Sequence, residues 1–475
     1  MRSGAAPSSS AAYRRYWIPT QLTPEVVRLP PRFRVRVKRH RLAMLAVQEV
    51  LAARGDLRVA LSRPCVYGVF GRPVGGMAPI EDDCVGCLRC TIEYPGVVQI
   101  TRNDERHTAG PAGVSVDEID TILYEARTGR VPVRGAGFRG PFGGTGWDGI
   151  WLDMSEIVRP TRDGIHGREY ISTVVDLGDR PAFLRLDEAG LPVPPLPRGR
   201  QIQVPFILGA APSRGAATTE RRSTAVVQSA LVETARRIDS LALVPLDAVI
   251  AHEFAASHVL PLVSPDKLDG LDRLASQPAM IELERWDAKQ CRGIIRRLPE
   301  TVVSVRVPLG SDVLALIGEG IRVFHLVARP MTASDRASLP DLIQRTHQQL
   351  VEAGIRDEVT LIGSGGIEIA EHVPKALACG LDAVVLDNPL WVALQARFAL
   401  DRAGADPHVT FPSCGSDWAV QRLLNLAAAW RDQLLEILGA MGLREVRRLR
   451  GELGRCLFQS DLEREAFGGI DGSPG

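Results

Sequence analysis

Three cysteines at intervals of three residues are the sharpest chemical signal in this chain. They are Cys84, Cys87 and Cys90. Thiolates at this spacing on a tight loop all point inward and can hold three corners of an iron–sulfur cube. Zinc or unligated thiols are the alternatives, although structural zinc usually takes two separated cysteine pairs. The spacing therefore predicts a [4Fe–4S] cluster.

The fourth corner of the cube needs another ligand. In bacterial runs of this type a further cysteine stands four residues later, before a proline, and it serves the other cluster of a two-cluster protein. Here that position is Tyr94, followed by Pro95. A chain that keeps one cluster should retain one lone upstream cysteine, and Cys65 has this place. We expect Cys65 to be the fourth ligand; an open-cornered [3Fe–4S] cluster is the alternative.

Length and composition limit the class of protein. The 475 residues predict two or three folding units, with 45% hydrophobic and 24% charged residues as in ordinary globular proteins. A net charge of +1 gives no case for nucleic-acid binding. No apolar run suits a membrane span and no signal region opens the chain, so we expect a cytoplasmic protein. The scattered cysteines, expected to be buried apolar residues, are Cys291, Cys379, Cys414 and Cys456.

The elements that must position any active site follow from residue 202 onward. There, short apolar runs alternate with amphipathic stretches, which predicts parallel strands joined by helices. Eight repeats predict a closed (β/α)8 TIM barrel, with an open doubly wound sheet as the alternative. The expected strands are Val204–Leu208, Leu241–Val244, Val259–Leu262, Met280–Glu284, Val302–Val307, Arg322–Val327, Thr360–Gly363 and Ala383–Leu386. The expected helices include Pro265–Ala275, Glu368–Ala378 and Pro389–Ala403.

The remaining regions differ from the barrel in composition, so the fold class is α/β with additions at both ends. A strand is expected at Val97–Ile100, helices at His40–Arg54 and Asp117–Arg127, and a proline-rich spacer at Pro192–Pro197. Helix is also expected across Trp418–Leu453. We expect five regions: a basic arm and helix (1–60), a small ferredoxin-like [4Fe–4S] module (61–110), a connecting segment (111–200), the barrel (201–410) and a helical C-terminal segment (411–475).

Candidate cofactor ligands lie where the barrel strands end, because active sites of such barrels lie at the carboxyl ends of their strands. Ser364, Gly365, Gly366 and Ile367 follow the seventh strand, and glycine N–H groups there can face a phosphate; a tight turn without a ligand is the alternative. The eighth strand ends in Asp387, whose charge weakens the phosphate interpretation. Gly209, after the first strand, is assigned to the same cofactor site.

Charged residues near other strand ends are weaker candidates. Arg306 on the fifth strand could stabilise negative charge on a reduced flavin ring, as a catalytic and cofactor-binding group, or belong to a salt bridge. Glu282, Glu284 and Arg329 lie at other strand ends, and His325 is expected to be a core residue.

Two loop segments also have open interpretations. Gly135–Gly144 is expected to be structural, with a phosphate loop as the alternative. The segment Asp153–Glu169 could clamp a dicarboxylate or phosphate, or form ion pairs between domains. Its candidate residues are Arg159, Arg162, His166 and Arg168.

Together these stretches resemble the FMN-binding glutamate synthase family, in its short archaeal-type form with a fused ferredoxin-like segment. The resemblance implies a barrel in which FMN reduces 2-iminoglutarate, formed from 2-oxoglutarate and ammonia, to L-glutamate, with electrons supplied by iron–sulfur clusters. It implies as partners a low-potential electron donor (ferredoxin or a reductase), an ammonia-supplying amidotransferase subunit and further copies of the chain. The segments that carry it are Cys84–Cys90, Phe138–Gly144, Met154–Arg168, Gly365–Ile367, Lys375–Leu377 and Met441–Glu445.

The chain departs from the family's pattern at the substrate loops. No Gly-Glu-Gly-Gly segment follows the second strand, and His325–Pro330 replaces a Gly-Asp-Gly-Gly-Thr-Gly segment. Arg306 stands in place of a lysine, the barrel cysteines of the family's [3Fe–4S] cluster are missing, and Arg2 rather than cysteine follows Met1. Two alternatives therefore stay open: a non-catalytic barrel that keeps its cluster for electron relay or as a scaffold, and a flavoenzyme for another amino or oxo acid.

Overall fold

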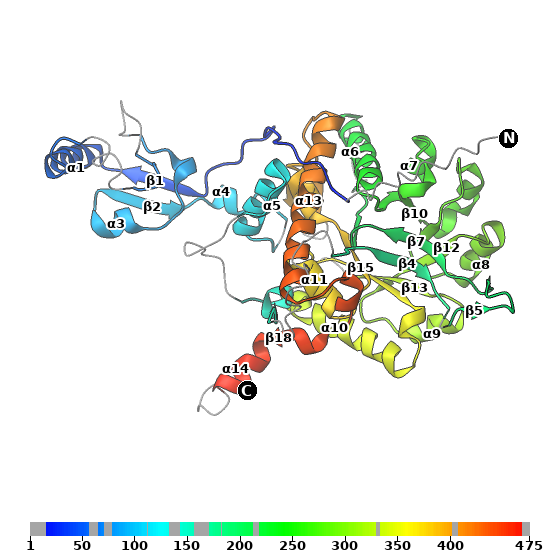
Figure 1. The fold of residues 1–475 in the computed structure, drawn as a ribbon. Helices are drawn as coiled ribbons and strands as arrows, with labels where there is room; N and C mark the ends of the chain where they lie inside the picture. Colours follow the sequence, from blue (N-terminus) through cyan, green and yellow to red (C-terminus); the bar gives the residue numbers. More distant parts are fainter. Residues whose placement is uncertain are drawn as a thin grey trace, which may run out of the picture.

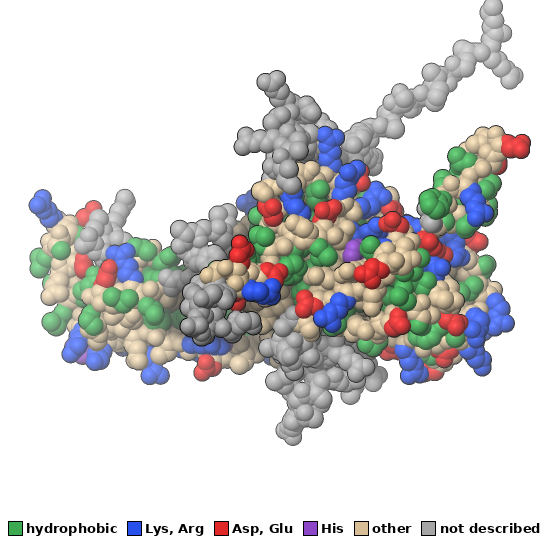
Figure 2. Space-filling model, turned by 90° about the horizontal axis from the view of Figure 1, so that it is seen from below, with side chains coloured by type: hydrophobic (Ala, Val, Ile, Leu, Met, Phe, Trp, Pro, Cys, Tyr) green, Lys and Arg blue, Asp and Glu red, His purple; other side chains and the backbone are tan. Residues whose placement is uncertain are grey.

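The computed structural model places a small module at one end of the molecule and a large barrel at the other (Figure 1). Figure 2 shows acidic and basic side chains interspersed over one face, in keeping with the net charge of +1. No helix among the described residues is long and apolar enough to cross a membrane. The described residues are 16–56, 65–70, 78–111, 113–132, 143–155, 171–181, 183–211, 218–328, 333–400 and 407–467.

Eight parallel strands close into a barrel, with neighbours in chain order and β15 pairing back onto β8. The predicted (β/α)8 barrel is confirmed, and the open-sheet alternative is wrong. Both faces of these strands are covered, so they are almost continuously apolar. The strands are β8 (Phe206–Leu208), β9 (Ala242–Pro245), β10 (Val259–Val263), β11 (Met280–Leu283), β12 (Val302–Pro308), β13 (Val323–Val327), β14 (Thr360–Ser364) and β15 (Ala383–Leu386).

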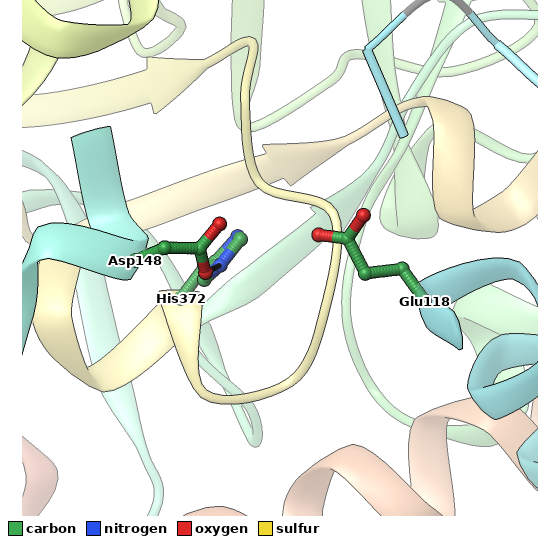
Figure 3. Close-up of side chains that lie close together, drawn as sticks. All are labelled: Glu118, Asp148 and His372. Carbon is green, nitrogen blue, oxygen red and sulfur yellow. Dashed lines mark hydrogen bonds and ion pairs between the residues drawn. The ribbon is translucent and has the colours of Figure 1, made fainter. Parts of the chain in front are cut away.

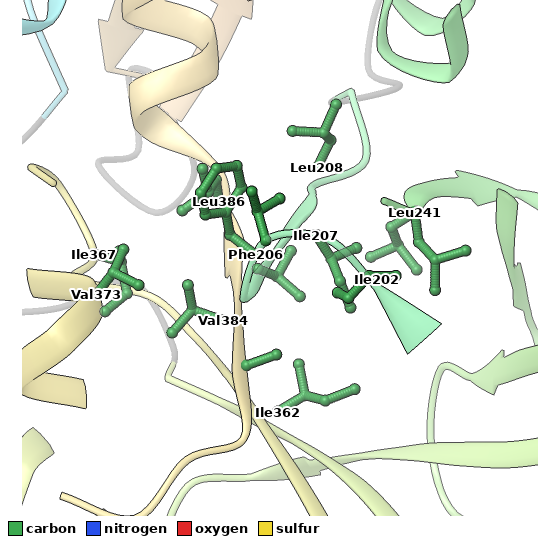
Figure 4. Close-up of a cluster of buried hydrophobic side chains, with 14 of the residues drawn as sticks. Ile202, Phe206, Ile207, Leu208, Leu241, Ile362, Ile367, Val373, Val384 and Leu386 are labelled. Atoms are coloured by element: carbon green, nitrogen blue, oxygen red, sulfur yellow. The ribbon is translucent and has the colours of Figure 1, made fainter. Parts of the chain in front are cut away.

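The hydrophobic core is filled by apolar side chains from both the barrel strands and the helices that cover them. Phe206, Ile362 and Val384 come from three strands, and Val373 comes from a covering helix (Figure 4). All four are at least 98% buried. The covering elements are α6 (Thr218–Arg237), α7 (Leu246–Ala251), η4 (Ala256–His258), η5 (Pro265–Arg273), α8 (Ala288–Arg297), α9 (Val313–Gly318), α10 (Ala333–Glu352), η6 (Arg356–Glu358), α11 (His372–Ala378) and α12 (Asn388–Ala393).

Four of the expected helices differ from the structure, and two of these lie around the barrel at Pro265–Ala275 and Pro389–Ala403. The helix expected at Pro265–Ala275 is the 3-10 helix η5, with a kink at Lys267. The helix expected at Pro389–Ala403 ends at Ala393, because Gln395 adopts a left-handed conformation with φ of 55°. The chain then continues as β16 (Arg397–Leu400), which pairs with β17 (Pro407–Thr410).

After the barrel, α13 (Ser416–Ala440) packs against α6 and against α5 (Val116–Thr128). The expected helix to Leu453 stops at Ala440, because Gly442 takes a left-handed φ of 71° that ends helices. Two 3-10 turns follow, η7 (Val446–Leu449) and η8 (Leu453–Arg455), and then β18 (Cys456–Phe458) and α14 (Gln459–Phe467). β18 pairs with β3 (Ile150–Leu152) from the connecting segment.

The N-terminal strap, residues 16–31, runs along the barrel before the chain enters the small module. The Tyr16 hydroxyl donates to the Ile238 carbonyl at 2.6 Å. Asn425 on α13 binds the backbone of Gln21 through both its amide oxygen and its amide nitrogen. Gln395 accepts from the backbone N–H groups of Val26 and Val27 at 2.8 and 2.9 Å. The left-handed Gln395 therefore holds the strap as well as ending α12.

The small module is built on two antiparallel strands, β1 (Phe33–Val37) and β2 (Val98–Arg102). The strand and helix expected there are confirmed, as β2 and α1 (Arg39–Ala52). The other elements are η1 (Glu81–Asp83), α3 (Arg89–Glu93) and α4 (Asp104–His107). Its buried core is small and consists of Val35, Leu42, Leu45, Val69, Phe70, Cys84, Cys90 and Val98.

A β-hairpin in the connecting segment covers the amino-terminal end of the barrel. It pairs β4 (Val175–Asp179) with β7 (Arg198–Ile202), and its tip holds β5 (Arg185–Leu186) and β6 (Pro192–Val193). The hydroxyl of Thr360, which begins β14, accepts from the Gly178 N–H and donates to the Gly178 carbonyl. The proline-rich stretch predicted as a spacer therefore belongs to this hairpin.

A buried ion-pair cluster ties the hairpin, the barrel and the C-terminal segment together. The Asp382 carboxylate accepts from Arg356 at 2.8 Å, Arg450 at 3.0 Å and Arg180 at 3.5 Å. The three arginines outweigh the opposing effect of burial and lower the pKa of Asp382.

His347 lies beside this cluster, where its Nδ1 accepts from Arg356 Nε at 3.0 Å. Burial, Arg356 and Arg450 lower the pKa of His347 to about 4.

We expect the free energy of unfolding to fall as the pH drops from 6.5 to about 4, because His347 titrates at about 4 in the folded chain and near 6.5 when unfolded. The unfolded chain binds the extra proton across this window, so this contribution is complete above the window and lost below it. His347→Gln should flatten the decline. Urea unfolding of both proteins at pH 7 and pH 5 measures the difference, and parallel declines would contradict the assignment.

Candidate functional site

Three polar side chains from adjacent strands meet inside the carboxyl end of the barrel. Glu282 lies on β11, Arg306 on β12 and His325 on β13, and Arg306 and His325 are direct register partners. Arg306 Nε donates to Glu282, and His325 Nδ1 lies 3.0 Å from both carboxylate oxygens. Glu282 is fully buried. Arg306 therefore forms the salt bridge that was one of its two predicted roles, and its partner is Glu282, one of the acids expected at the strand ends.

The electrostatics of this cluster fix its hydrogen-bond roles. Burial raises the pKa of Glu282, but His325 and Arg306 outweigh it and leave this pKa lowered. Glu282 is therefore a carboxylate that accepts from His325 Nδ1. The second ring nitrogen of His325 is buried without a hydrogen-bond partner in the described part of the chain, as is the Ser304 hydroxyl on β12. Buried polar groups are seldom left unpaired, which makes this end of the barrel a candidate ligand site.

Asp387 follows β15 at the same end of the barrel. Burial raises the pKa of Asp387 against the lowering effect of Arg306 and His325. Its carboxyl group lies against Gly209, where an added Cβ would come 2.2 Å from Asp387 Oδ1. The Asp387 carboxyl group therefore occupies the space that a side chain at position 209 would fill.

The glycine turn after β14 is a tight turn with two left-handed glycines, a conformation compatible with both interpretations of this segment. Gly365 and Gly366 have φ values of +92° and +71°, which other residues rarely adopt. A Cβ at Gly365 would come 2.8 Å from the Ala328 side chain. Ser364 pairs with Val327 and Val385, which places the turn at the same barrel end as Arg306. The next helix begins at His372, so the expected start at Glu368 is wrong.

A junction between the connecting segment and α11 lies beside the turn (Figure 3). Glu118 from α5, Asp148 from η2 (Gly146–Gly149) and His372 from α11 have ligand atoms within 4.8 Å of one another. His372 Nδ1 lies 3.1 Å from the Glu368 backbone nitrogen and 3.2 Å from the Gly366 carbonyl oxygen, and Nε2 lies 3.1 Å from Asp148 Oδ1. These contacts join the His372 ring to the glycine turn and to Asp148, and the three side chains form a candidate metal group.

The four predicted cluster ligands come together in the small module. Cys65, Cys84, Cys87 and Cys90 all line one small pocket beneath Phe70. The loop that presents them bends through left-handed residues, Gly86 with φ of 66° and Leu88 with φ of 57°. A Cβ at Gly86 would come 2.3 Å from the Phe33 ring, so the loop requires glycine there. The Gly86 N–H also donates to the Cys84 sulfur.

The spacing of these thiols favours a cluster over a single ion. Zinc–sulfur bonds of about 2.3 Å place four sulfur atoms about 3.8 Å apart. Among the described residues, ligand atoms all within 4.8 Å of one another occur at Glu118, Asp148 and His372, and not at these cysteines. Burial, Cys65 and Cys87 raise the pKa of Cys90 to about 11. Burial also raises the pKa of Cys84. A strongly cationic centre would favour the thiolate forms of these two buried cysteines.

Some candidates were missed by sequence reasoning or fall outside the structure's described ranges. His325, a strand-end candidate expected to be a core residue, is buried as expected, but its pairing with Glu282 was not predicted. Glu118, Asp148 and His372 carried no sequence motif. The candidates Arg159, Arg162, His166, Arg168 and Arg329, and the glycines from Gly135 to Gly140, lie outside the described residues.

The fold and site define a (β/α)8 barrel with a polar carboxyl end and an attached four-cysteine module. Residues 328–400, which include β14, the glycine turn and β15, match the family described as the conserved region in glutamate synthase. An archaeal glutamate synthase [NADPH] from Archaeoglobus fulgidus is 23% identical, over 86% of this chain and 93% of its own. An archaeal-type glutamate synthase [NADPH] from Dehalococcoides mccartyi is 22% identical, over 78% and 86%. The predicted resemblance to this family is confirmed.

Other matches are shorter or more distant. The archaeal glutamate synthase [NADPH] of Methanocaldococcus jannaschii is 32% identical over 29% of each chain. Among solved structures, a mandelate oxidase mutant is 13% identical with a TM-score of 0.42, covering 72% of this chain and 90% of the other. A flavocytochrome b2 mutant is 12% identical with a TM-score of 0.44, covering 78% and 84%.

Proposed function

We propose that this chain is an iron–sulfur flavoenzyme of the glutamate synthase type. It reduces 2-iminoglutarate, formed from 2-oxoglutarate and ammonia, with electrons passed from a [4Fe–4S] cluster to FMN. The observation that carries the proposal is the similarity to archaeal-type glutamate synthases over most of both chains. A low-potential donor, either ferredoxin or a reductase, supplies the electrons, and ammonia comes from solution or an amidotransferase partner.

The residues at the barrel end fit a flavin mononucleotide. The N–H groups of the left-handed turn, Ser364 to Ile367, would hold the phosphate. Asp387 lies at the same barrel end, where burial raises the pKa of its carboxyl group. Gly209 leaves the space that Asp387 needs. FMN, when bound, stores two electrons and releases them as a hydride.

Arg306, Glu282 and His325 would act on the ring and the substrate. The Arg306 guanidinium stabilises negative charge that develops nearby, and its effect is large because the site is buried. Glu282 holds the Arg306 and His325 side chains at fixed positions through hydrogen bonds. The His325 nitrogen that has no partner among the described residues is free to bind a ligand atom or hold a proton. Cys65, Cys84, Cys87 and Cys90 would hold the cluster, which passes single electrons.

We expect Arg306→Met to lower the rate of glutamate formation by about 100-fold or more, because it removes the positive charge that stabilises the transition state. Arg306→Lys keeps the charge and should recover part of the rate. Arg322→Met is the matched control, since Arg322 lies before β13 at the opposite barrel end. Thermal unfolding of each variant separates lost activity from lost folding. If Arg306→Met formed glutamate at the rate of the natural protein, Arg306 would have no role in the reaction.

The proposed function is tested by the absorption spectrum and composition of anaerobically purified protein. One acid-released FMN per chain together with about four irons would support it. Glutamate should then form from 2-oxoglutarate and ammonia with a chemically reduced low-potential donor. Iron without flavin, even after FMN is added, would overturn the flavoenzyme and favour the scaffold or electron-relay alternative. Flavin reduction without glutamate formation would favour another amino or oxo acid.

A further inference from the structure

Two cysteines outside the cluster pocket lie in contact although they are far apart in sequence. Cys379 directly follows α11, and Cys456 begins β18. Their thiols are close enough for a hydrogen bond between them, and both are unoxidised in the structure. Cys379 is fully buried and Cys456 is 8% exposed. Both were expected to be ordinary buried residues, and their contact was not predicted.

The surrounding fold holds this pair in place. Cys456 is the register partner of Leu152 across β18 and β3. The Gly451 N–H donates to the Leu377 carbonyl at 3.1 Å, which lays the chain before β18 along α11. On the other side, the Gln344 amide donates to the Cys379 sulfur at 3.5 Å. The thiol contact therefore follows from three separate backbone and side-chain anchors.

The two thiols have unequal chemistry. Lys375 lies one turn before Cys379 on α11, and its amine is held inside the protein by the Trp147 carbonyl at 3.0 Å. The hydrogen bond from Cys379 and the charge of Lys375 lower the pKa of Cys456 in spite of burial. The same hydrogen bond and burial raise the pKa of Cys379. Cys456 is thus the more acidic thiol of the two, and thiolates react with oxidants much faster than thiols do.

We propose that Cys379 and Cys456 are a reversible oxidation site that forms a disulfide when the protein meets a peroxide. The Cys456 thiolate attacks one oxygen of hydrogen peroxide and becomes a sulfenic acid, while the other oxygen leaves as hydroxide and is protonated to water. The Cys379 sulfur then attacks the sulfenic sulfur and expels a second water. In total two thiols lose two protons and two electrons, and one peroxide becomes two waters.

The disulfide would tie the C-terminal segment to the helix that follows the glycine turn. Reduced Cys379 and Cys456 connect α11 to β18 by a weak thiol contact, and the oxidised pair would connect them covalently. Closing so long a stretch of chain restricts the unfolded state, which raises thermal stability. The remaining cysteines of the barrel region give a contrast, because burial raises the pKa of both Cys291 and Cys414.

The test uses the reduced holoprotein with its natural cysteines. Graded hydrogen peroxide is added, free thiols are blocked with an alkylating reagent, and proteolytic peptides are identified by mass spectrometry. We expect a cross-linked peptide that joins Cys379 to Cys456 at doses that leave Cys291 and Cys414 alkylatable. A small dithiol should remove it, and the midpoint of thermal unfolding should be higher in the oxidised form. Because each modified cysteine is identified by its peptide, oxidation of the cluster cysteines can be distinguished from the cross-link between Cys379 and Cys456.

Serine variants supply the control. Cys456→Ser and Cys379→Ser should each abolish the cross-link and the rise in melting temperature, while Cys414→Ser should keep both. Two results in the natural protein would overturn the proposal. One is sulfinic acid on Cys456 beside an alkylated Cys379, and the other is alkylation of both cysteines at doses that already oxidise Cys414. Neither depends on whether a variant folds.

Discussion

Replacing Cys84 with serine should remove the cluster and unfold the small module while the barrel stays folded. Cys84 and Cys90 are both part of the module's few buried residues, and so small a core cannot stabilise a domain alone. Binding of the metal cluster would supply the missing folding energy. We expect the iron content to fall from about four per chain to near zero, with loss of visible absorption. Limited proteolysis should then cut between residues 33 and 107.

Cys414→Ser is the matched control for this variant, because Cys414 lies half-buried outside the cluster pocket. It should keep full iron content and the protease resistance of the natural protein. Cys65→Ser tests the fourth ligand separately. Unchanged spectra and about four irons in Cys65→Ser would remove Cys65 from the ligand set, and the same result in Cys84→Ser would remove the cluster assignment.

Asp382→Ala should be the most destabilising change in the barrel region. The substitution leaves Arg356 buried without its carboxylate, and it also removes the acceptor of the Leu361 N–H at 2.8 Å. Removing one partner of a buried ion pair costs about 3–5 kcal/mol. Urea unfolding at pH 7 measures this loss, and a loss below about 1 kcal/mol would mean that the arginines find other partners.

Asp357→Ala gives the comparison. Asp357 binds the same Arg450, but its side chain is 86% exposed. Exposed pairs contribute about 0–1 kcal/mol, so this variant should stay close to the natural protein. A similar loss in both variants would show that the ion-pair cluster acts as a surface network.

The barrel could be predicted from sequence because its strands are buried on both faces. Strands such as Val302–Pro308 and Ala383–Leu386 are apolar runs bounded by turns and amphipathic helices, so local pattern and global fold agree. The prediction fails where a distant contact decides the local structure. The helix after Asn388 ends early because Gln395 binds the N-terminal strap, and no local pattern encodes that contact.

The same distinction applies to the candidate sites. Cys84, Cys87 and Cys90 are close in sequence, so their spacing alone indicates their chemistry. Glu282 and His325 were individually visible, but their pairing depends on strand register. The contact between Cys379 and Cys456 needs the full path of the chain around α11, which spacing cannot supply.

The N-terminal strap has a consequence for the order in which the protein is made. The strap leaves the ribosome first, but Asn425, which binds its Gln21, is made 404 residues later. At about 5–20 residues per second, this delay is roughly 20–80 seconds. For most of that time the strap lacks its partners Gln395 and Asn425, although the cysteine module has already been made. If the module holds the proposed cluster, it can receive iron while the barrel is still being translated, and cluster assembly does not have to wait for the barrel to close.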